Sequence, residues 1–560
     1  MEPDERKTGF ALLAVFLFAS VIPVFLYALR QYDNSRLTSW LDVASKVNAV
    51  NAVHVYLTII LGLALAYFIS KTSFIYRSPA LLLFVFSFLA SSVFWLEPEV
   101  IIDASRYFTQ AKHLETYGIV YFLMEWGRDI FAWTDLPLVP FLYGLIFKFF
   151  GESRLYIQIL NSFFLSSTVV LTYLIGRDLW DEEHGLWAGG FLLSIQYLFT
   201  QTPLMLVDTA SMFFLTLSVY SFRRALIKGG VIIWVSVFSV FAAVMTKYSL
   251  WPALSALVVI FFAGRPNAPG TVLRRGLYVF FGFLMLITPV VLLKYDVILE
   301  QINILTGYQR AGLRRWGESF TSIFFFQMHP FVPLCAMVSV YAAFRKRDKK
   351  YIAVAWLVSL ALIGGVRRIR YIIPLFPMVA LMASYGLGLL SDRRVKSFIV
   401  FAAVFSSLAI GMFAYLPYLK SLSSINLKNA GEYLDSISAP AVEVFTFSSE
   451  RDINPAVAVP LLDIYTKKRI FYDYSPAAVK PPEGFLSSPF RFTWLYRNPR
   501  YYSDSVDGSA VVVITDDLSA EMPERVRDRL ENYKEAAAFD ISDDYRFQTK
   551  IKVFTRANGL

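Results

Sequence analysis

Three acidic residues, Glu97, Glu99 and Asp103, open a polar stretch that lies between apolar runs of membrane-spanning length. An ionisable side chain at a membrane boundary is costly unless it is hydrated, paired or used, so it is a candidate functional residue. We take Asp103 as the centre of chemistry. The structural alternative is that Asp103 only caps a helix of about four turns, which the spacing of apolar residues predicts between Asp103 and Gly118.

A second carboxylate and a group of arginines could act together with Asp103. Asp208 stands near one end of another apolar run, and Arg367, Arg368 and Arg370 precede a further one. The fork of donors on a guanidinium group suits the oxygens of a phosphate. The structural alternative is that these arginines only reach the membrane surface from a helix end. Two aspartates and an arginine group on one face of a membrane favour a functional site over three unrelated charges.

The composition defines the class of protein that must position these residues. Of 560 residues 56% are hydrophobic and 17% are charged, which is typical of a polytopic membrane protein. In such a chain a net charge of +10 reflects Lys and Arg in short cytoplasmic loops, so we do not expect a nucleic-acid partner. The single cysteine, Cys335, excludes a disulfide within the chain and a thiolate metal cluster.

Apolar runs of about 20 residues, the length that a transmembrane helix needs, recur along the sequence. Segment 136–150 is shorter and is interrupted by Pro137 and Pro140, so we expect it to lie at the membrane surface or to re-enter it. The sequence predicts about thirteen transmembrane helices, at 9–29, 49–69, 79–96, 155–176, 185–203, 205–222, 231–247, 248–263, 276–294, 323–344, 351–366, 371–390 and 397–418.

The distribution of Lys and Arg predicts how these spans are oriented. With the N-terminus in the cytoplasm, loop after loop on the inner side carries the basic residues, as the positive-inside rule requires. The loop 97–133, Asp208, the loop 295–322 and the region after residue 419 then lie on the outer side. The arginines at 367–370 are the exception to the rule. The loop 295–322 is long, and we expect either a lid over the site or an ordinary solvated basic loop.

The composition changes after residue 419. We expect a soluble α/β domain over 421–560, with strands at 442–447, 511–515 and 550–554 and an amphipathic helix at 523–537. It contains no glycine-rich phosphate loop, so a lid or an acceptor-binding cap is the expected role. The predicted domains are two additional N-terminal helices (1–78), a transmembrane catalytic domain (79–420, with first outer loop 97–135) and this outer domain (421–560).

The order of several short motifs resembles that of the GT-C membrane glycosyltransferases, especially the protein O-mannosyltransferase group and the bacterial aminoarabinose transferases that modify lipid A. The resemblance covers residues 79–420. Its motifs are Asp-x-x-x-Tyr from Asp103, a Pro-bearing piece before Phe149 to Gly151, Asn161, Ile175 to Arg177, Leu206 to Asp208, Thr246 to Tyr248, and Arg370 to Pro377.

The resemblance implies transfer of a sugar from a polyprenyl-phosphate donor, dolichyl- or undecaprenyl-linked, on the outer side of the cell membrane. The acceptor would be a hydroxyl group of a protein, a lipid or a glycan. It implies that Asp103 is the catalytic carboxylate, assisted by Asp208. A carboxylate can take the proton of the acceptor as the bond to phosphate breaks, and one such base implies inversion. The remaining site residues expected are Arg370, Tyr371, Arg367 and Lys247 for the donor phosphate, and Tyr107 and Arg314 for substrate.

The sequence departs from the family at several positions. Ala104 follows Asp103 where many relatives have a glutamate. Thr134 and Asp135 precede Pro137 where the lipid A enzymes have a lysine, which argues against lipid A as the acceptor. No cofactor is certain; a divalent metal is considered only because His329 stands where some relatives bind one.

Two other classes of function compete with the enzyme. A transporter or flippase of lipid-linked sugars would use the aspartates to relay protons or bind substrate, but transporters usually carry such charges at the bilayer midplane and show internal repeats. Here the charges lie at the outer boundary, which favours the enzyme. A non-catalytic scaffold leaves both aspartates unexplained.

Overall fold

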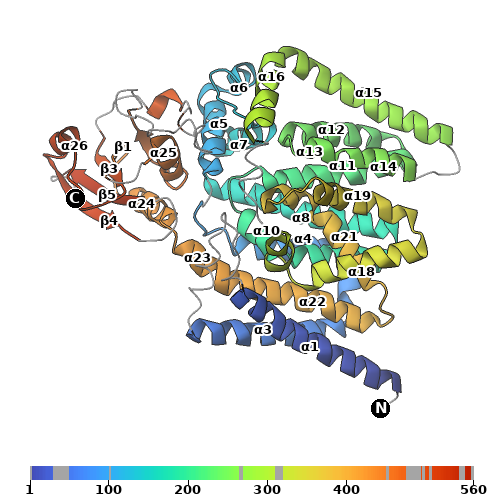
Figure 1. Cartoon of the computed structure of the whole chain (residues 1–560). Helices are drawn as coiled ribbons and strands as arrows, with labels where there is room; N and C mark the ends of the chain where they lie inside the picture. The colour runs from blue at the N-terminus through green and yellow to red at the C-terminus, as the bar shows by residue number, and fades with distance from the viewer. Residues whose placement is uncertain are drawn as a thin grey trace.

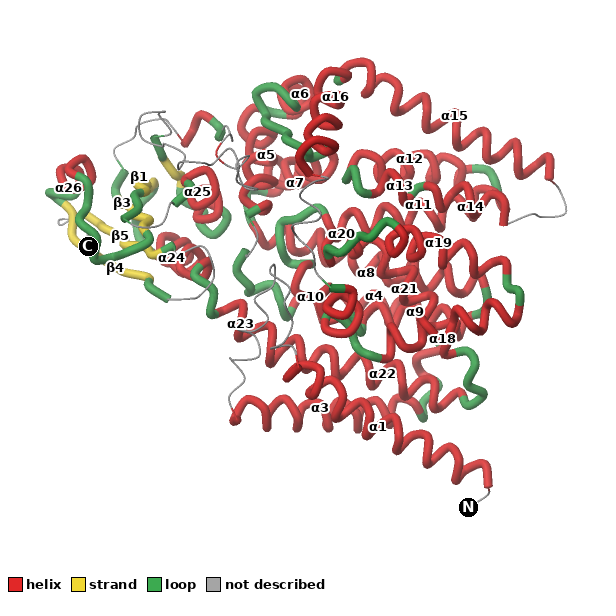
Figure 2. Tube along the Cα trace, in the orientation of Figure 1, coloured by secondary structure: helices red, strands yellow, loops and turns green. Residues whose placement is uncertain are grey.

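The computed structural model describes residues 3–29, 49–99, 102–263, 269–309, 319–449, 453–473, 494, 498–502, 508–541 and 549–556. A large helical part and a smaller part with a β-sheet lie side by side (Figures 1 and 2). The sheet is built entirely from the C-terminal part of the chain. This division confirms the predicted fold class, a helical membrane protein with a C-terminal α/β domain.

Every predicted span contains a helix or a pair of helices. Among the described residues, five helical segments are long and apolar enough to cross a membrane: 53–70, 154–179, 269–293, 369–387 and 393–415. Shorter apolar helices occupy several of the other predicted spans, so the number of crossings remains a prediction. The helices of these spans are α1 (Pro3–Leu29), α3 (Ala49–Ser70), α4 (Pro79–Ser92), α8 (Arg154–Leu179), α9 (Glu182–Leu193), α10 (Gln196–Gln201), α11 (Asp208–Lys228), α12 (Val231–Thr246), α13 (Leu250–Ala253), α14 (Ser255–Ala263), α15 (Pro269–Leu293), α18 (Phe331–Lys346), α19 (Lys349–Ile363), α20 (Ile369–Ile372), α21 (Phe376–Leu387), α22 (Arg393–Ile410) and α23 (Leu416–Lys420).

The two leading helices lie along one side of the bundle. α3 packs along α22, and α1 packs against both (Figure 1). Gly62 of α3 makes this contact close, because a Cβ atom there would lie 2.9 Å from Cβ of Phe405. On the opposite side of the view, α15 packs against α11 and α12, and α16 (Tyr295–Ile304) lies beside α6 (Ile119–Glu125) (Figure 1).

The segment between α4 and α8 contains three short helices: α5 (Asp103–Tyr117), α6 (Ile119–Glu125) and α7 (Leu138–Phe150). α5 ends as predicted at Gly118, whose φ of 92° suits glycine. α7 spans 13 residues after Pro137 and packs against α5. Gly144 allows this packing, since a Cβ atom there would lie 2.7 Å from Cβ of Leu114. The position of α5 therefore depends on a close helix contact.

The C-terminal domain contains one five-stranded sheet in the order β2-β1-β3-β5-β4. The first three strands of that order are parallel, and β5 pairs antiparallel with both β3 and β4. The predicted strands are confirmed as β1 (Ala441–Thr446), β3 (Ala510–Thr515) and β5 (Lys550–Arg556), and β2 (Arg469–Phe471) joins them. The helices of this domain are α24 (Ser424–Ser436), α25 (Pro455–Asp463) and α26 (Glu524–Arg529).

One prediction in this domain is wrong in its second half. The helix expected over 523–537 stops with α26, and the chain then forms β4 (Tyr533–Phe539). The reason is tertiary: β4 hydrogen-bonds along β5, with Phe539 opposite Ile551 and Tyr533 opposite Arg556. Strand pairing overrides the helix preference of the Lys, Glu and Ala residues in this segment.

The C-terminal domain docks on the segment between α4 and α8 through α25, which packs against α5. The Lys112 ammonium of α5 forms an ion pair with Glu152 and lies 3.7 Å from the Asp463 carboxylate of α25. The main-chain N–H of Arg500 donates to the Tyr117 hydroxyl at 2.7 Å. The helix that begins with Asp103 is thus held from two sides, by α7 and by the outer domain.

Candidate active site

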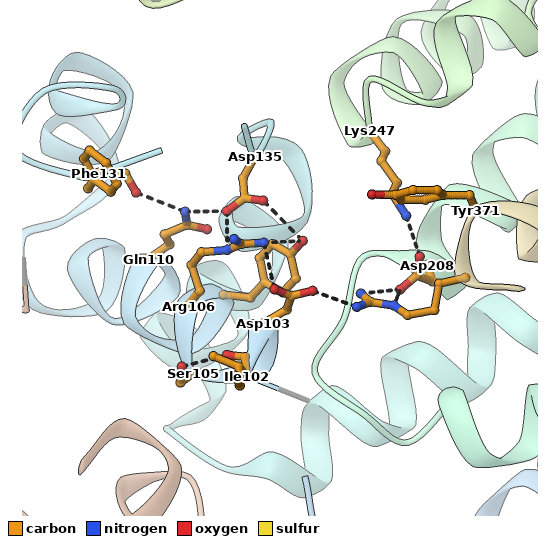
Figure 3. A network of polar contacts seen from close by, with 12 residues as sticks. Ile102, Asp103, Ser105, Arg106, Gln110, Phe131, Asp135, Asp208, Lys247 and Tyr371 are labelled. Atoms are coloured by element: carbon orange, nitrogen blue, oxygen red, sulfur yellow. Dashed lines mark hydrogen bonds and ion pairs between the residues drawn. The ribbon is translucent and has the colours of Figure 1, made fainter. Parts of the chain in front are cut away.

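Three helix starts meet at one end of the bundle. α5 begins at Asp103, α11 begins at Asp208, and the short α20 carries Arg370. Asp103 is the first residue of its helix and makes no side-chain capping bond, so the capping interpretation is wrong. Its carboxylate is 20% exposed and is paired with arginines instead (Figure 3).

Arg370 joins the two predicted carboxylates. Its Nη1 donates to Asp103 Oδ2 at 2.7 Å, and its Nε and Nη2 donate to Asp208 Oδ2 at 3.0 and 2.8 Å. The arginine side chain is only 10% exposed, so water competes little with these contacts. The guanidinium fork explains why one residue can hold two carboxylates that are far apart in the sequence.

Asp208 has a separate cation on each oxygen. Lys247 Nζ donates to Asp208 Oδ1 at 2.6 Å, while Arg370 occupies Oδ2. Lys247 follows the last residue of α12 in an extended backbone conformation, and its ammonium lies 4.8 Å from the centre of the Tyr371 ring. The side chain of Asp208 is 1% exposed, and such a buried carboxylate requires this pairing.

A second arginine continues the network away from Asp103. Arg106 lies one turn further along α5, with its Nη2 3.2 Å from Asp103 Oδ1 and its Nε 2.7 Å from Asp135 Oδ2. Asp135 also accepts from the Tyr107 hydroxyl at 3.3 Å and from Gln110 Nε2 at 3.1 Å (Figure 3). The network therefore contains three carboxylates and three cations, from five separate parts of the chain.

The charges affect Asp103 and Asp135 in opposite ways. Burial alone would raise the pKa of Asp103, but the charges of Arg106 and Arg370 outweigh it and hold that pKa well below its usual value. For Asp135 burial prevails over the charge of Arg106 and raises the pKa to about 6. In this arrangement Asp103 is an anion at neutral pH and accepts a proton poorly, because two cations stabilise its charge.

The structure places most of the predicted residues in or beside this network and leaves others outside it. Asp103, Asp208, Arg370, Lys247, Tyr371 and Tyr107 contact one another directly or through one neighbour. Arg367 is exposed, and its guanidinium carbon lies 5.6 Å from the centre of the Phe320 ring. Arg314 falls outside the described residues.

His329 contacts main-chain groups outside this network. Its ring Nδ1 accepts from the main-chain N–H of Phe331 at 3.2 Å, and the main-chain N–H of His329 donates to the carbonyl of Ser194 at 3.0 Å. Over the part of the chain that the structure describes, no group of three or more His, Cys, Asp or Glu side chains could hold a metal ion. The divalent metal considered from the sequence remains a prediction.

Sequence reasoning missed Arg106 and Gln110 as members of the site, and it treated Asp135 only as a departure from a family pattern. A usable signal was present in α5: Asp103, Arg106, Tyr107 and Gln110 follow the spacing i, i+3, i+4 and i+7, which places them on one face of a helix. Four polar residues on one face of a buried helix indicate a polar partner, which the structure identifies as Asp135.

The comparisons agree with this fold. A family model described as dolichyl-phosphate-mannose-protein mannosyltransferase matches residues 135–293. An uncharacterised protein of Aquifex aeolicus (strain VF5) is 23% identical over 356 residues, which cover 60% of this chain and 68% of that protein.

The fold is similar to that of ArnT from Cupriavidus metallidurans. With ArnT bound to undecaprenyl phosphate, the TM-score is 0.54 at 11% identity, over 85% of this chain and 98% of ArnT. With the apo state it is 0.51 at 12% identity, over 84% and 97%. The chain therefore has the fold of ArnT, contains a segment similar to the mannosyltransferase family, and carries the apolar helices of a multi-pass membrane protein.

Proposed function

We propose that this protein transfers a sugar from a polyprenyl-phosphate donor to an acceptor hydroxyl on the outer face of the cell membrane. The N-terminus would lie in the cytoplasm and the C-terminal domain outside. The observation that carries the proposal is the contact of Arg370 with both Asp103 and Asp208, because it brings a phosphate-binding group and two carboxylates together at one end of the bundle. The matching family description and the ArnT complex with undecaprenyl phosphate support the donor class.

Arg370, Lys247, Tyr371 and Arg367 are the proposed ligands of the donor phosphate. In the described network Arg370 and Lys247 are already paired with carboxylates, and the phosphate has to compete for them. Arg370 can give up Asp103 and still keep Asp208, since separate nitrogens make the two contacts. The donor phosphate would therefore take Nη1 of Arg370 and leave Asp103 with Arg106 alone.

This exchange explains how Asp103 can act as a general base. While Arg370 is bound to it, the pKa of its carboxyl group is held far below that of an effective base. Once the donor phosphate draws Arg370 away, the pKa rises and the carboxylate can take the proton of the acceptor hydroxyl. As the bond between sugar C1 and the phosphate oxygen breaks, Arg370 and Lys247 would stabilise the charge that develops on the leaving phosphate. A single displacement of this kind inverts the configuration at C1.

The acceptor and the sugar are the less defined parts of the proposal. Tyr107 lies beside Asp103 on α5, and we assign it to the substrate-binding wall together with Arg314 from the loop 295–322. The match to a mannosyltransferase family makes mannose the first sugar to test, with a protein hydroxyl as the first acceptor. Lipid and glycan hydroxyls are the further acceptors.

The test is transfer from radiolabelled polyprenyl-phosphate sugars to candidate acceptors by purified protein, for wild type and for Asp103→Asn. We expect transfer to fall by at least about a hundredfold, as for loss of a general base. Glu115→Gln is the matched control, because this carboxylate lies on the same helix and outside the network. Undiminished transfer by Asp103→Asn would exclude its catalytic role. Flipping of the intact donor without transfer by the wild type would favour the transporter.

A further inference from the structure

Asp135 is the carboxylate of the network that has no role in the proposed mechanism. It lies in the connection between α6 and α7, two residues after Trp133, whose φ of 49° is rare for a residue with a side chain. Its carboxylate accepts from Tyr107 and Gln110. Its main-chain carbonyl accepts from Gln301 Nε2 of α16 at 2.8 Å. Two elements therefore fix both the main chain and the side chain of this residue.

Arg106 is shared unequally between Asp135 and Asp103. Its Nε lies 2.7 Å from Asp135, whereas its Nη2 lies 3.2 Å from Asp103. The closer partner is thus the carboxylate that the rest of the loop holds in place. A fixed Asp135 limits how closely Arg106 can approach Asp103, because both contacts belong to one rigid guanidinium plane.

We propose that Asp135 is a positioning residue. It holds Arg106 so that Asp103 keeps only one weak contact with a cation, and Asp103 can then act as a base once Arg370 has turned from it to the donor phosphate. This inference rests on the proposed function, in which Asp103 takes the proton. Without the charge of Asp135, Arg106 would turn fully to Asp103 and stabilise its anion. Asp103 would then be a weaker base, although the donor ligands Arg370 and Lys247 would be unchanged.

The groups around Asp135 are consistent with a charged residue at working pH. Arg106, Tyr107 and Asp103 face it from α5, and α16 contributes the uncharged amide of Gln301. Burial raises the pKa of Asp135 to about 6, so above that pH it is an anion and holds Arg106. Its neutral form at lower pH would release Arg106 toward Asp103.

The test is the pH dependence of kcat for Asp135→Asn in the transfer assay, with donor KM measured alongside. We expect kcat on the plateau to fall about tenfold with donor KM within about twofold of the wild-type value. The acid limb of the wild type should begin near pH 6, where Asp135 becomes neutral and releases Arg106, and in Asp135→Asn it should move to the lower pH where only Asp103 titrates. A structural role alone would lower the amount of folded protein without moving that limb. Asp129→Asn, an exposed aspartate of the same loop, is the matched control.

A double-mutant cycle with Arg106→Gln separates this role from others. If Asp135 acts through Arg106, then Asp135→Asn should shift the acid limb in the wild-type background and leave it unmoved in the Arg106→Gln background. The double variant also avoids an uncompensated buried charge, so the position of its acid limb can be measured even where Asp135→Asn does not fold. In that case, an acid limb that differs between the double variant and Arg106→Gln would overturn the proposal.

The outcomes are distinguishable from failure of the proposed function. Loss of transfer in Asp103→Asn together with an unmoved acid limb in Asp135→Asn would overturn the role of Asp135 alone. A fall in kcat accompanied by an equal rise in donor KM would also overturn it, because Asp135 would then act on donor binding. Full transfer by Asp103→Asn would remove the proposed function itself.

Discussion

Arg370→Gln tests the central contact of the site. The change removes one hydrogen bond to Asp103 and two to Asp208, but each carboxylate keeps one cation, Arg106 at 3.2 Å and Lys247 at 2.6 Å respectively. Breaking a buried ion pair costs about 3–5 kcal/mol when one charge is left uncompensated. Because both carboxylates stay partly compensated, we expect a loss of about 3 kcal/mol in the free energy of unfolding, at the lower end of that range.

The larger effect should appear in donor use. A hydrogen bond between charged groups contributes about 1.5–3 kcal/mol, which corresponds to about a 10- to 150-fold rise in donor KM when the phosphate loses Arg370. The pH dependence should change as well. Arg370 lowers the pKa of Asp103, so its removal raises that pKa and moves the acid limb of kcat/KM to higher pH.

Initial rates at varied donor concentration and pH, measured on protein that elutes as wild type in detergent, would check these values. Arg370→Lys is the informative companion variant, because it keeps the charge but cannot reach both carboxylates with a fork. It should restore the position of the acid limb better than it restores donor KM. A wild-type donor KM and an unmoved acid limb in Arg370→Gln would show that this arginine neither binds the phosphate nor controls Asp103.

Three further changes address other parts of the structure. The Glu97 carboxylate is fully buried and has no hydrogen-bond partner among the described residues, and burial raises its pKa to about 7. Its ionisation therefore costs folding free energy as the pH rises from about 4.5 to 7. Glu97→Gln should accordingly stabilise the protein by about 3 kcal/mol at pH 8 and hardly at pH 5, as measured by thermal unfolding at both pH values. Lys247→Met should raise donor KM by at least about tenfold, seen in the same initial-rate assay, because it leaves the phosphate and Asp208 with Arg370 alone. Gly144→Ala should lower kcat and thermal stability together, because the new Cβ would clash with Leu114 and displace α5.

The site residues that could be predicted from the sequence are those placed by membrane topology. Asp103, Asp208 and Arg370 stand at the ends of apolar runs, and the topology predicted from the other basic loops puts those ends on one side of the membrane, although Arg370 itself departs from the positive-inside rule. Because the predicted topology gave all three the same side, their meeting could be expected before any contact was known. The extent of α5 was also predictable, since its polar and apolar spacing and Gly118 are local signals.

The residues that could not be predicted depend on contacts between distant segments. Asp135 reaches Arg106 because of a turn at Trp133 and a hydrogen bond from Gln301, which comes 166 residues later in the chain. No local pattern encodes that approach. The error at Tyr533–Phe539 has the same cause, because pairing with β5 decided the conformation of a segment whose composition favours a helix.

The pairing of charges in the network predicts the order of donor binding and acceptor deprotonation. Its three carboxylates and three cations balance, so no cation is in excess for an anionic donor among Arg106, Lys247 and Arg370. To bind Arg370, a phosphodiester has to displace a carboxylate, and Asp103 is the more exposed of the two on Arg370, at 20% against 1% for Asp208. In the proposed mechanism, displacement of Asp103 activates the base only where donor is present, which predicts that the acceptor is deprotonated after the donor binds and not before. An acceptor that binds Asp103 productively without donor would contradict this order.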